Sequence, residues 1–197
     1  ALDAAMSGST PIFLVTQRDL TVDVPGRDDL YDVGTIASVR QILRLPDNNV
    51  RVMVEGTARG RLLDVQSAEP YLAAVVEELP PAVKPRANSP KAEAQVRQCY
   101  SLVERYTELS DRVTSETYLK ILASDDPAYI ADYITQNLPL RYEDKQVILE
   151  ELRPGRRLDK LVRILSREID ILEVETELEA KVHEQMAGNQ RDYFLRE

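Results

Sequence analysis

The sequence is divided by the stretch PPAVKPRANSP at residues 80–90. Its four prolines favour a stiff, extended backbone, because each proline ring restricts φ and removes an amide donor. Eight of the 11 prolines and five of the 7 glycines lie in residues 1–90, which predicts short strands and turns there. We therefore expect a β-rich subdomain at 1–80, a linker at 81–90, a helical bundle at 91–155 and a long helix at 156–197.

An antiparallel sheet with one helix is predicted for the first subdomain. Residues 2–6 are typical of the last turn of a helix, with Gly8 just past its end. Alternating valines at positions 50, 52 and 54 predict one buried strand face. The stretch PDNN at 46–49 predicts a hairpin connection, because Asp and Asn tolerate positive φ. The predicted strands are 12–15, 34–45, 50–55, 61–66 and 71–77.

Capping residues and prolines mark the helices of the second part. They predict four helices before the last one. The first starts after Asn88 or Ser89, the second covers about 115–122, the third starts after Asp126 and the fourth covers 142–152. The first of these carries an apolar stripe of Ala92, Val96, Cys99, Val103 and Tyr106. Because Cys99 lies on this stripe, we expect a buried structural thiol and not a reactive one.

The last helix is predicted from Arg156 to about Ala187, a segment without proline or glycine. It would be ~48 Å long, whereas a compact domain of this size is only ~33 Å across, so we expect it to project. Its apolar stripe shifts from one face to another, with Leu158, Leu161, Leu165, Ile169 and Leu172 followed by Ile171, Val174, Leu178, Val182 and Met186. The proximal part should pack on the bundle, and the distal part should meet a partner or a second copy.

Six apolar side chains are therefore candidates for contacting a polypeptide substrate or partner. They are Met53 in the β subdomain and Leu178, Val182, Met186, Tyr193 and Phe194 in the last helix. Methionine suits a surface that binds varied partners, because its side chain is flexible and polarizable. Two alternatives stay open: the helix residues pack on a further module, and Met53 belongs to the core.

Composition excludes several classes of function. The net charge of −9 and pI of about 4.8 disfavour binding to nucleic acid or to an anionic membrane. No stretch approaches the ~20 apolar residues of a membrane span. Cys99 and His183 are the only residues of their types, which excludes internal disulfides, His/Cys zinc sites, Ser-His-Asp triads and Cys-His dyads. A reducing, cytoplasmic location fits this composition.

Two near-motifs fail on spacing. HEQMA at residues 183–187 has alanine where a zinc-protease motif has its second histidine. GTARGR at 56–61 has one residue too few between its glycines for a phosphate-binding loop. We therefore expect no catalytic, cofactor-binding or metal-binding residue in this chain.

Six segments resemble, in the same order, the amino-terminal domain of bacterial Lon proteases. They are PIFLVTQRD at 11–19, DLYDVGTIA at 29–37, LPDNNVRVMVEG at 45–56, LPLRYEDKQ at 138–146, QM at 185–186 and NQRDYFLRE at 189–197. The resemblance implies an α+β fold: a small antiparallel PUA-like β domain, then an α-helical bundle that ends in a long projecting helix. Two features depart from the family, since the chain starts inside the first helix without the family's earlier strands, and Thr57 replaces a larger apolar residue.

The resemblance also implies a function. The chain would be a non-catalytic fragment that recognises unfolded or damaged proteins and aids assembly of a homohexameric ring. ATP, magnesium and the Ser-Lys dyad of the ATP-dependent serine endopeptidase would belong to the rest of the parent protein. One alternative is a purely structural oligomerisation module that touches no substrate. Another is DNA binding, which the charge of −9 disfavours.

Overall fold

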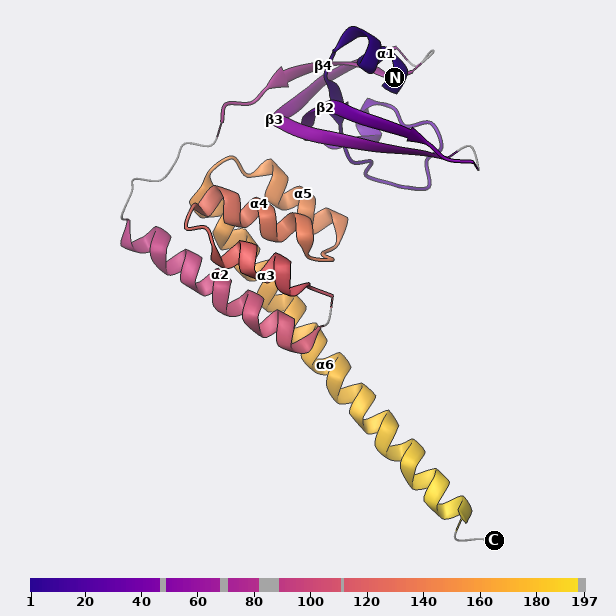
Figure 1. The fold of residues 1–197 in the computed structure, drawn as a ribbon, viewed down its shortest axis with the longest axis vertical. Coiled ribbons are helices and arrows are strands. Elements are labelled where there is room, and N and C mark those ends of the chain that lie inside the picture. Colours follow the sequence, from indigo (N-terminus) through magenta and orange to yellow (C-terminus); the bar gives the residue numbers. More distant parts are fainter. Residues whose placement is uncertain (47–48, 68–70, 82–88, 111, 195–197) are drawn as a thin grey trace. The chain divides into compact units, whose positions relative to one another are not determined.

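The computed structural model describes residues 1–46, 49–67, 71–81, 89–110 and 112–194, with side chains described as far as Met186 (Figure 1). Two compact units are present, Ala1–Ala82 and Val83–Glu197. The fold is α+β, with the sheet in the first unit and a helical bundle in the second, which confirms the predicted class. Most of the predicted linker, residues 82–88, lies outside the described residues.

The described part of the first unit forms a four-stranded antiparallel sheet in the order β1-β2-β3-β4. Its elements are α1 (Leu2–Gly8), β1 (Ile12–Leu14), β2 (Val33–Arg44), β3 (Val50–Ser67) and β4 (Ala73–Glu78), with a short 3-10 turn at Arg27–Asp29. The carboxylate of Asp29 accepts a hydrogen bond of 2.8 Å from the Gly26 N–H, which stabilises that turn. Phe13 of β1, Ile36 of β2 and Val76 of β4 meet over Gly60 on one face of the sheet, where Leu62 of β3 is buried.

The predicted break between two strands at 56–60 is wrong, because β3 runs without interruption from Val50 to Ser67. Gly60 pairs with Gly34 of β2, and the register between the strands shifts next to Ile36. A Cβ built on Gly34 would lie 2.6 Å from Cζ of Phe13, so a larger residue does not fit there. Gly34 and Gly60 instead allow neighbouring strands to approach closely.

The predicted buried valine face is also wrong. Val50 and Val54 are exposed, and only Val52 is half-buried. β1 reaches β2 only at residues 35–37, and β4 reaches β3 only at residues 60–67. The hairpin end therefore extends as a two-stranded ribbon past both outer strands, and the start of α1 lies beside Val50 without burying it.

The end of α1 differs from the prediction by one residue. Gly8 is the last helical residue, and Ser9 adopts the left-handed conformation with φ of 49°. The Ser9 N–H donates to the Ala5 carbonyl, as in helix ends capped by a left-handed residue. Serine in place of glycine at this position carries a small conformational cost.

The second unit is a helical bundle around one apolar core. Its helices are α2 (Pro90–Leu109), α3 (Ser115–Leu122), α4 (Pro127–Asn137), α5 (Tyr142–Glu150) and α6 (Pro154–Phe194). The core includes Val96, Cys99, Val103, Ile121, Ile130, Ile134, Ile148, Leu158, Leu161 and Leu165. Asp126 caps α4 as predicted, because its carboxylate accepts a 2.9 Å hydrogen bond from the Ala128 N–H.

The predicted start of the last helix, Arg156, is two residues late. Pro154 is the first residue of α6. A proline is accommodated in the first turn because its missing N–H would have no helical acceptor there. Gly155 lies in the same turn, where its carbonyl accepts a 3.2 Å hydrogen bond from the side-chain amide of Gln95, a buried residue.

Candidate functional site

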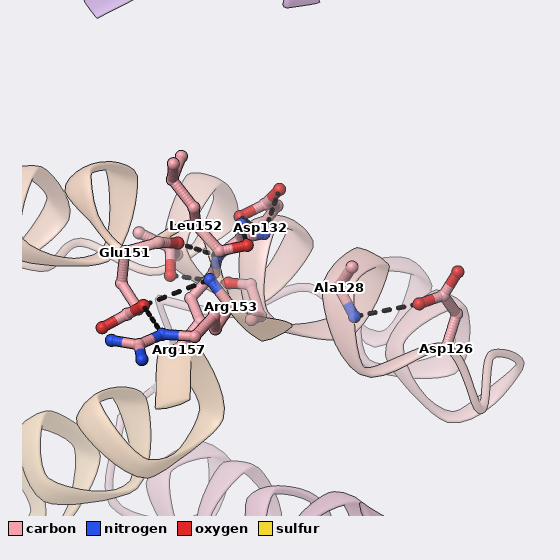
Figure 2. Close-up of polar contacts among 9 residues, drawn as sticks. Asp126, Ala128, Asp132, Glu151, Leu152, Arg153 and Arg157 are labelled. Atoms are coloured by element: carbon pink, nitrogen blue, oxygen red, sulfur yellow. Dashed lines mark hydrogen bonds and ion pairs between the residues drawn. The ribbon is translucent and has the colours of Figure 1, made fainter. Parts of the chain in front are cut away.

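A buried arginine fixes the base of α6 (Figure 2). Arg157 is only 1% exposed, and its Nη1 lies 3.0 Å from both carboxylate oxygens of Asp132 on α4. Its Nε donates to the Glu151 carbonyl at 2.9 Å, and its Nη2 donates to the Leu152 carbonyl at 3.4 Å. The guanidinium thus joins α4, the end of α5 and the start of α6, because its planar donors reach all three at once.

Glu151 adds charge pairing at the same junction. Burial acts to raise the pKa of its carboxyl, but hydrogen bonds from the Arg153 backbone and side chain, with the charges of Arg153 and Lys160, lower it overall. Its oxygens lie 3.2 Å from Arg153 Nε and 3.6 Å from Lys160 Nζ. Glu151 therefore stays ionised, and the base of α6 has a fixed arrangement of charges.

The apolar stripe of α6 changes face part-way along the helix, as predicted. Leu158, Leu161 and Leu165 are fully buried in the bundle, and Ile169 and Leu172 continue this face. The second stripe is Ile171, Val174, Leu178, Val182 and Met186. At ~100° per residue its centre lies about a third of a turn from the core face. It therefore cannot be a continuation of the bundle contact.

An ion pair marks where the bundle contact ends. Arg105 near the end of α2 contacts Glu173 with Nη2 2.8 Å from Oε1. Beyond this pair α6 continues alone within its unit (Figure 1). The five side chains of the second stripe, Ile171 to Met186, are between 45% and 63% exposed. We call this surface the arm stripe.

Four of the predicted contact residues can be placed. Leu178, Val182 and Met186 lie together on the arm stripe, and Met53 lies on the other unit. The side chains of Tyr193 and Phe194 are outside the described residues. Met53 is 61% exposed on the hairpin ribbon, where it pairs with Gln41 of β2. The predicted alternative of a core position is wrong, because a core side chain would be buried.

Sequence reasoning missed an apolar cavity in the first unit. It has a volume of about 500 Å³ and is lined by α1, β1, β3, β4 and the segments beside them. Its lining is mainly aliphatic and aromatic, and includes Ile12, Phe13, Leu62, Leu72 and Val76. Such a lining can hold an apolar side chain. No local motif signals it, because the residues come together only when the strands pair.

The chemistry of the site is that of an apolar contact surface. Within the described ranges, no group of three His, Cys, Asp or Glu side chains is arranged to hold a metal ion. His183 lies exposed on α6. None of the helices that the structure describes has the length and apolar character needed to cross a lipid bilayer.

Cys99 should be unreactive in the folded chain. It is fully buried, and burial, together with the charge of Asp159, raises the pKa of its thiol to about 12 from an ordinary 9.0. We expect iodoacetamide at pH 8 to label it only after urea unfolding, as measured by mass spectrometry. Rapid iodoacetamide labelling of the folded chain would contradict the burial of the Cys99 thiol.

The same shift predicts how stability depends on pH. Because the pKa of the Cys99 thiol is higher in the folded chain than in the unfolded chain, the contribution of the thiol to stability is fully present below pH 9 and is lost as pH rises towards 12.

Comparison with known proteins identifies the family. Residues 1–167 match the model of the ATP-dependent protease La (LON) substrate-binding domain. The chain belongs to this family. The Lon protease of Heliobacterium modesticaldum is 38% identical over 197 residues, and that of Escherichia coli K12 is 37% identical over 196. Each alignment covers 100% of this chain but only 24% and 25% of the relative, so the chain spans about a quarter of their length.

Solved structures share the Lon N-terminal fold. The Lon N-terminal domain protein from Xanthomonas campestris has a TM-score of 0.57 at 16% identity, covering 82% of this chain and 80% of that one. The N-terminal domain of Mycobacterium avium complex Lon protease has a TM-score of 0.58 at 19% identity, covering 80% and 91%. The family match ends at residue 167, so the arm stripe lies beyond it, although the Lon relatives align over the whole chain.

Proposed function

We propose that this Lon substrate-binding domain captures unfolded or damaged polypeptides through the arm stripe and Met53, for an ATP-dependent protease module elsewhere in the parent protein. One observation carries the proposal: a second apolar face on α6, rotated from the core face and exposed over four turns. Unfolded chains expose the aliphatic and aromatic side chains that such a face can cover. The domain itself would contribute no catalytic group, and it would act in the cytoplasm.

Assembly is part of the same proposal. A projecting helix can also contact neighbouring copies, which would help to form a homohexameric ring. The competing function is a structural module that pairs arm with arm and touches no substrate. Both functions use the same apolar residues, so exposure alone does not separate them.

Light scattering of the chain with reduced, unfolded casein tests the proposal. We expect a complex with casein, and we expect the triple variant Leu178→Ser, Val182→Ser, Met186→Ser to bind it about tenfold or more weakly. Each side chain would lose ~0.5–1 kcal/mol of apolar contact from its half-exposed area, and 1.4 kcal/mol corresponds to tenfold.

Leu119→Ser on α3 is the matched control, because Leu119 is an exposed leucine of the same unit outside the arm stripe. It should bind casein as the unchanged chain does. A stable dimer that ignores casein, and that the triple variant converts to a monomer, would favour the structural module instead. Equal casein binding by the triple variant and the control would contradict the assignment to the arm stripe.

A further inference from the structure

The surroundings of the arm stripe are strongly acidic. Residues 170–186 contain six carboxylates, Asp170, Glu173, Glu175, Glu177, Glu179 and Glu184, against one lysine, Lys181. Glu173 is paired with Arg105 of α2. Glu175, Glu177 and Glu179 are exposed. Any partner that covers the arm stripe must therefore approach a surface of net negative charge.

The two edges of the stripe differ. Glu177 and Lys181 are four residues apart on one edge. The glutamate precedes the lysine, which is the order in which the two opposite charges stabilise a helix best. Glu175 and Glu179 are also four residues apart, but they have the same charge. Glu175 is one turn from Ile171 and Glu179, so it borders the apolar residues directly. This edge is left unbalanced, and like charges at this spacing mildly destabilise the helix.

A second copy of the chain fits the charge of this surface less well than a basic client does. Pairing two arm stripes would bring together two segments that each carry six carboxylates and one lysine. Like charges beside an apolar seam oppose such pairing. An acidic client would meet the same repulsion. A basic client would relieve the repulsion between Glu175 and Glu179 while its aliphatic residues cover the stripe.

We infer that the arm stripe selects polypeptide segments in which lysine or arginine residues flank aliphatic ones, with the basic residues placed against Glu175 and Glu179. This rests on the proposed function and names the class of substrate that the arm prefers. The apolar contact supplies most of the binding energy, and the acidic edge selects among unfolded segments of similar hydrophobicity.

Three labelled, unstructured peptides with the same leucine and valine residues, and with Lys, Ser or Glu at the remaining positions, test this inference. Fluorescence anisotropy with the full 197-residue chain gives their dissociation constants. We expect the Lys peptide to bind about tenfold more tightly than the Glu peptide, because several exposed charge pairs along this edge each add a small part of the difference. Raising the salt from about 50 to about 500 mM should shrink this ratio several-fold, since exposed charges are then screened.

The variant Glu175→Gln, Glu179→Gln should reduce the preference for the Lys peptide several-fold and leave the Ser peptide unchanged. Single variants provide a matched pair on one helix: Glu179→Gln should weaken Lys-peptide binding, whereas Glu184→Gln, on the opposite side of α6 from the stripe, should not. Circular dichroism of each variant confirms that α6 is intact.

The outcomes separate the two proposals. All three peptides could bind equally well, and the Leu178→Ser, Val182→Ser variant could bind none of them. This result overturns the charge preference and leaves the proposed function standing. Binding of none of them overturns both. A dimer that dissociates in the same serine variant, with no peptide bound, shows that a second copy is the occupant and overturns the inference.

Discussion

Replacing Arg157 with alanine should lower the free energy of unfolding of the helical unit by about 2–4 kcal/mol. The change removes the donor to Asp132 and leaves the Glu151 and Leu152 carbonyls without this partner. It also empties the volume of a side chain that is 1% exposed. The effect falls below that of a fully buried pair because the Asp132 side chain is 44% exposed and can be hydrated. Urea denaturation followed by circular dichroism measures it.

Arg153→Ala is the control for this prediction. Arg153 contacts Glu151 from a side chain that is 60% exposed. We expect a loss below ~1 kcal/mol, as for other surface ion pairs. Equal effects of the two substitutions would mean that the buried guanidinium does not fix the base of α6.

Gly34→Val should unfold the sheet unit and leave the helical unit folded. Its Cβ would lie 2.6 Å and 2.9 Å from ring atoms of Phe13 and would also collide with the Leu14 carbonyl oxygen. The backbone oxygen cannot move without breaking the pairing of β1 with β2. We expect a loss of ~3 kcal/mol or more, since overpacking here displaces a strand as well as a side chain. Amide hydrogen exchange should rise across β1 and β2 and stay unchanged across α2–α5.

Gly8→Ala tests whether this effect is specific to the close strand approach. A Cβ at Gly8 would meet only side-chain atoms of Thr10, at 3.5 and 3.7 Å, which is ordinary contact. Alanine also favours the helix by up to ~1 kcal/mol over glycine. Unchanged exchange in Gly34→Val, or increased exchange in Gly8→Ala, would contradict the packing described for the sheet.

Local signals predicted the helical unit well. α3 matches its predicted range at 115–122, and Asp126 with Pro127 marks the start of α4. The shift of the apolar stripe on α6 was readable because helical spacing persists over many turns. This shift predicted that Leu178, Val182 and Met186 share a face away from the bundle core, and all three side chains are exposed.

The sheet unit was less predictable because its features depend on partners distant in sequence. Gly56 and Gly60 lie in the predicted gap between two strands, whereas pairing with β2 keeps them inside β3. The exposure of Val50 and Val54 depends on how far β1 and β4 extend, which alternation does not report. Arg157 gave no local sign of burial, since only the fold brings Asp132 and the carbonyls around it.

The continuity of α6 also has a mechanical consequence. The helix spans 41 residues, and residues 156–187 contain neither proline nor glycine, the usual points of bending. Its far end is therefore the long arm of a lever whose fulcrum is the packed segment from Arg157 to Ile169. A pull on a polypeptide held at Met186 would act on the bundle as a torque, opposed by close-packed leucines and by the Arg157 contacts, and would not be absorbed by local bending.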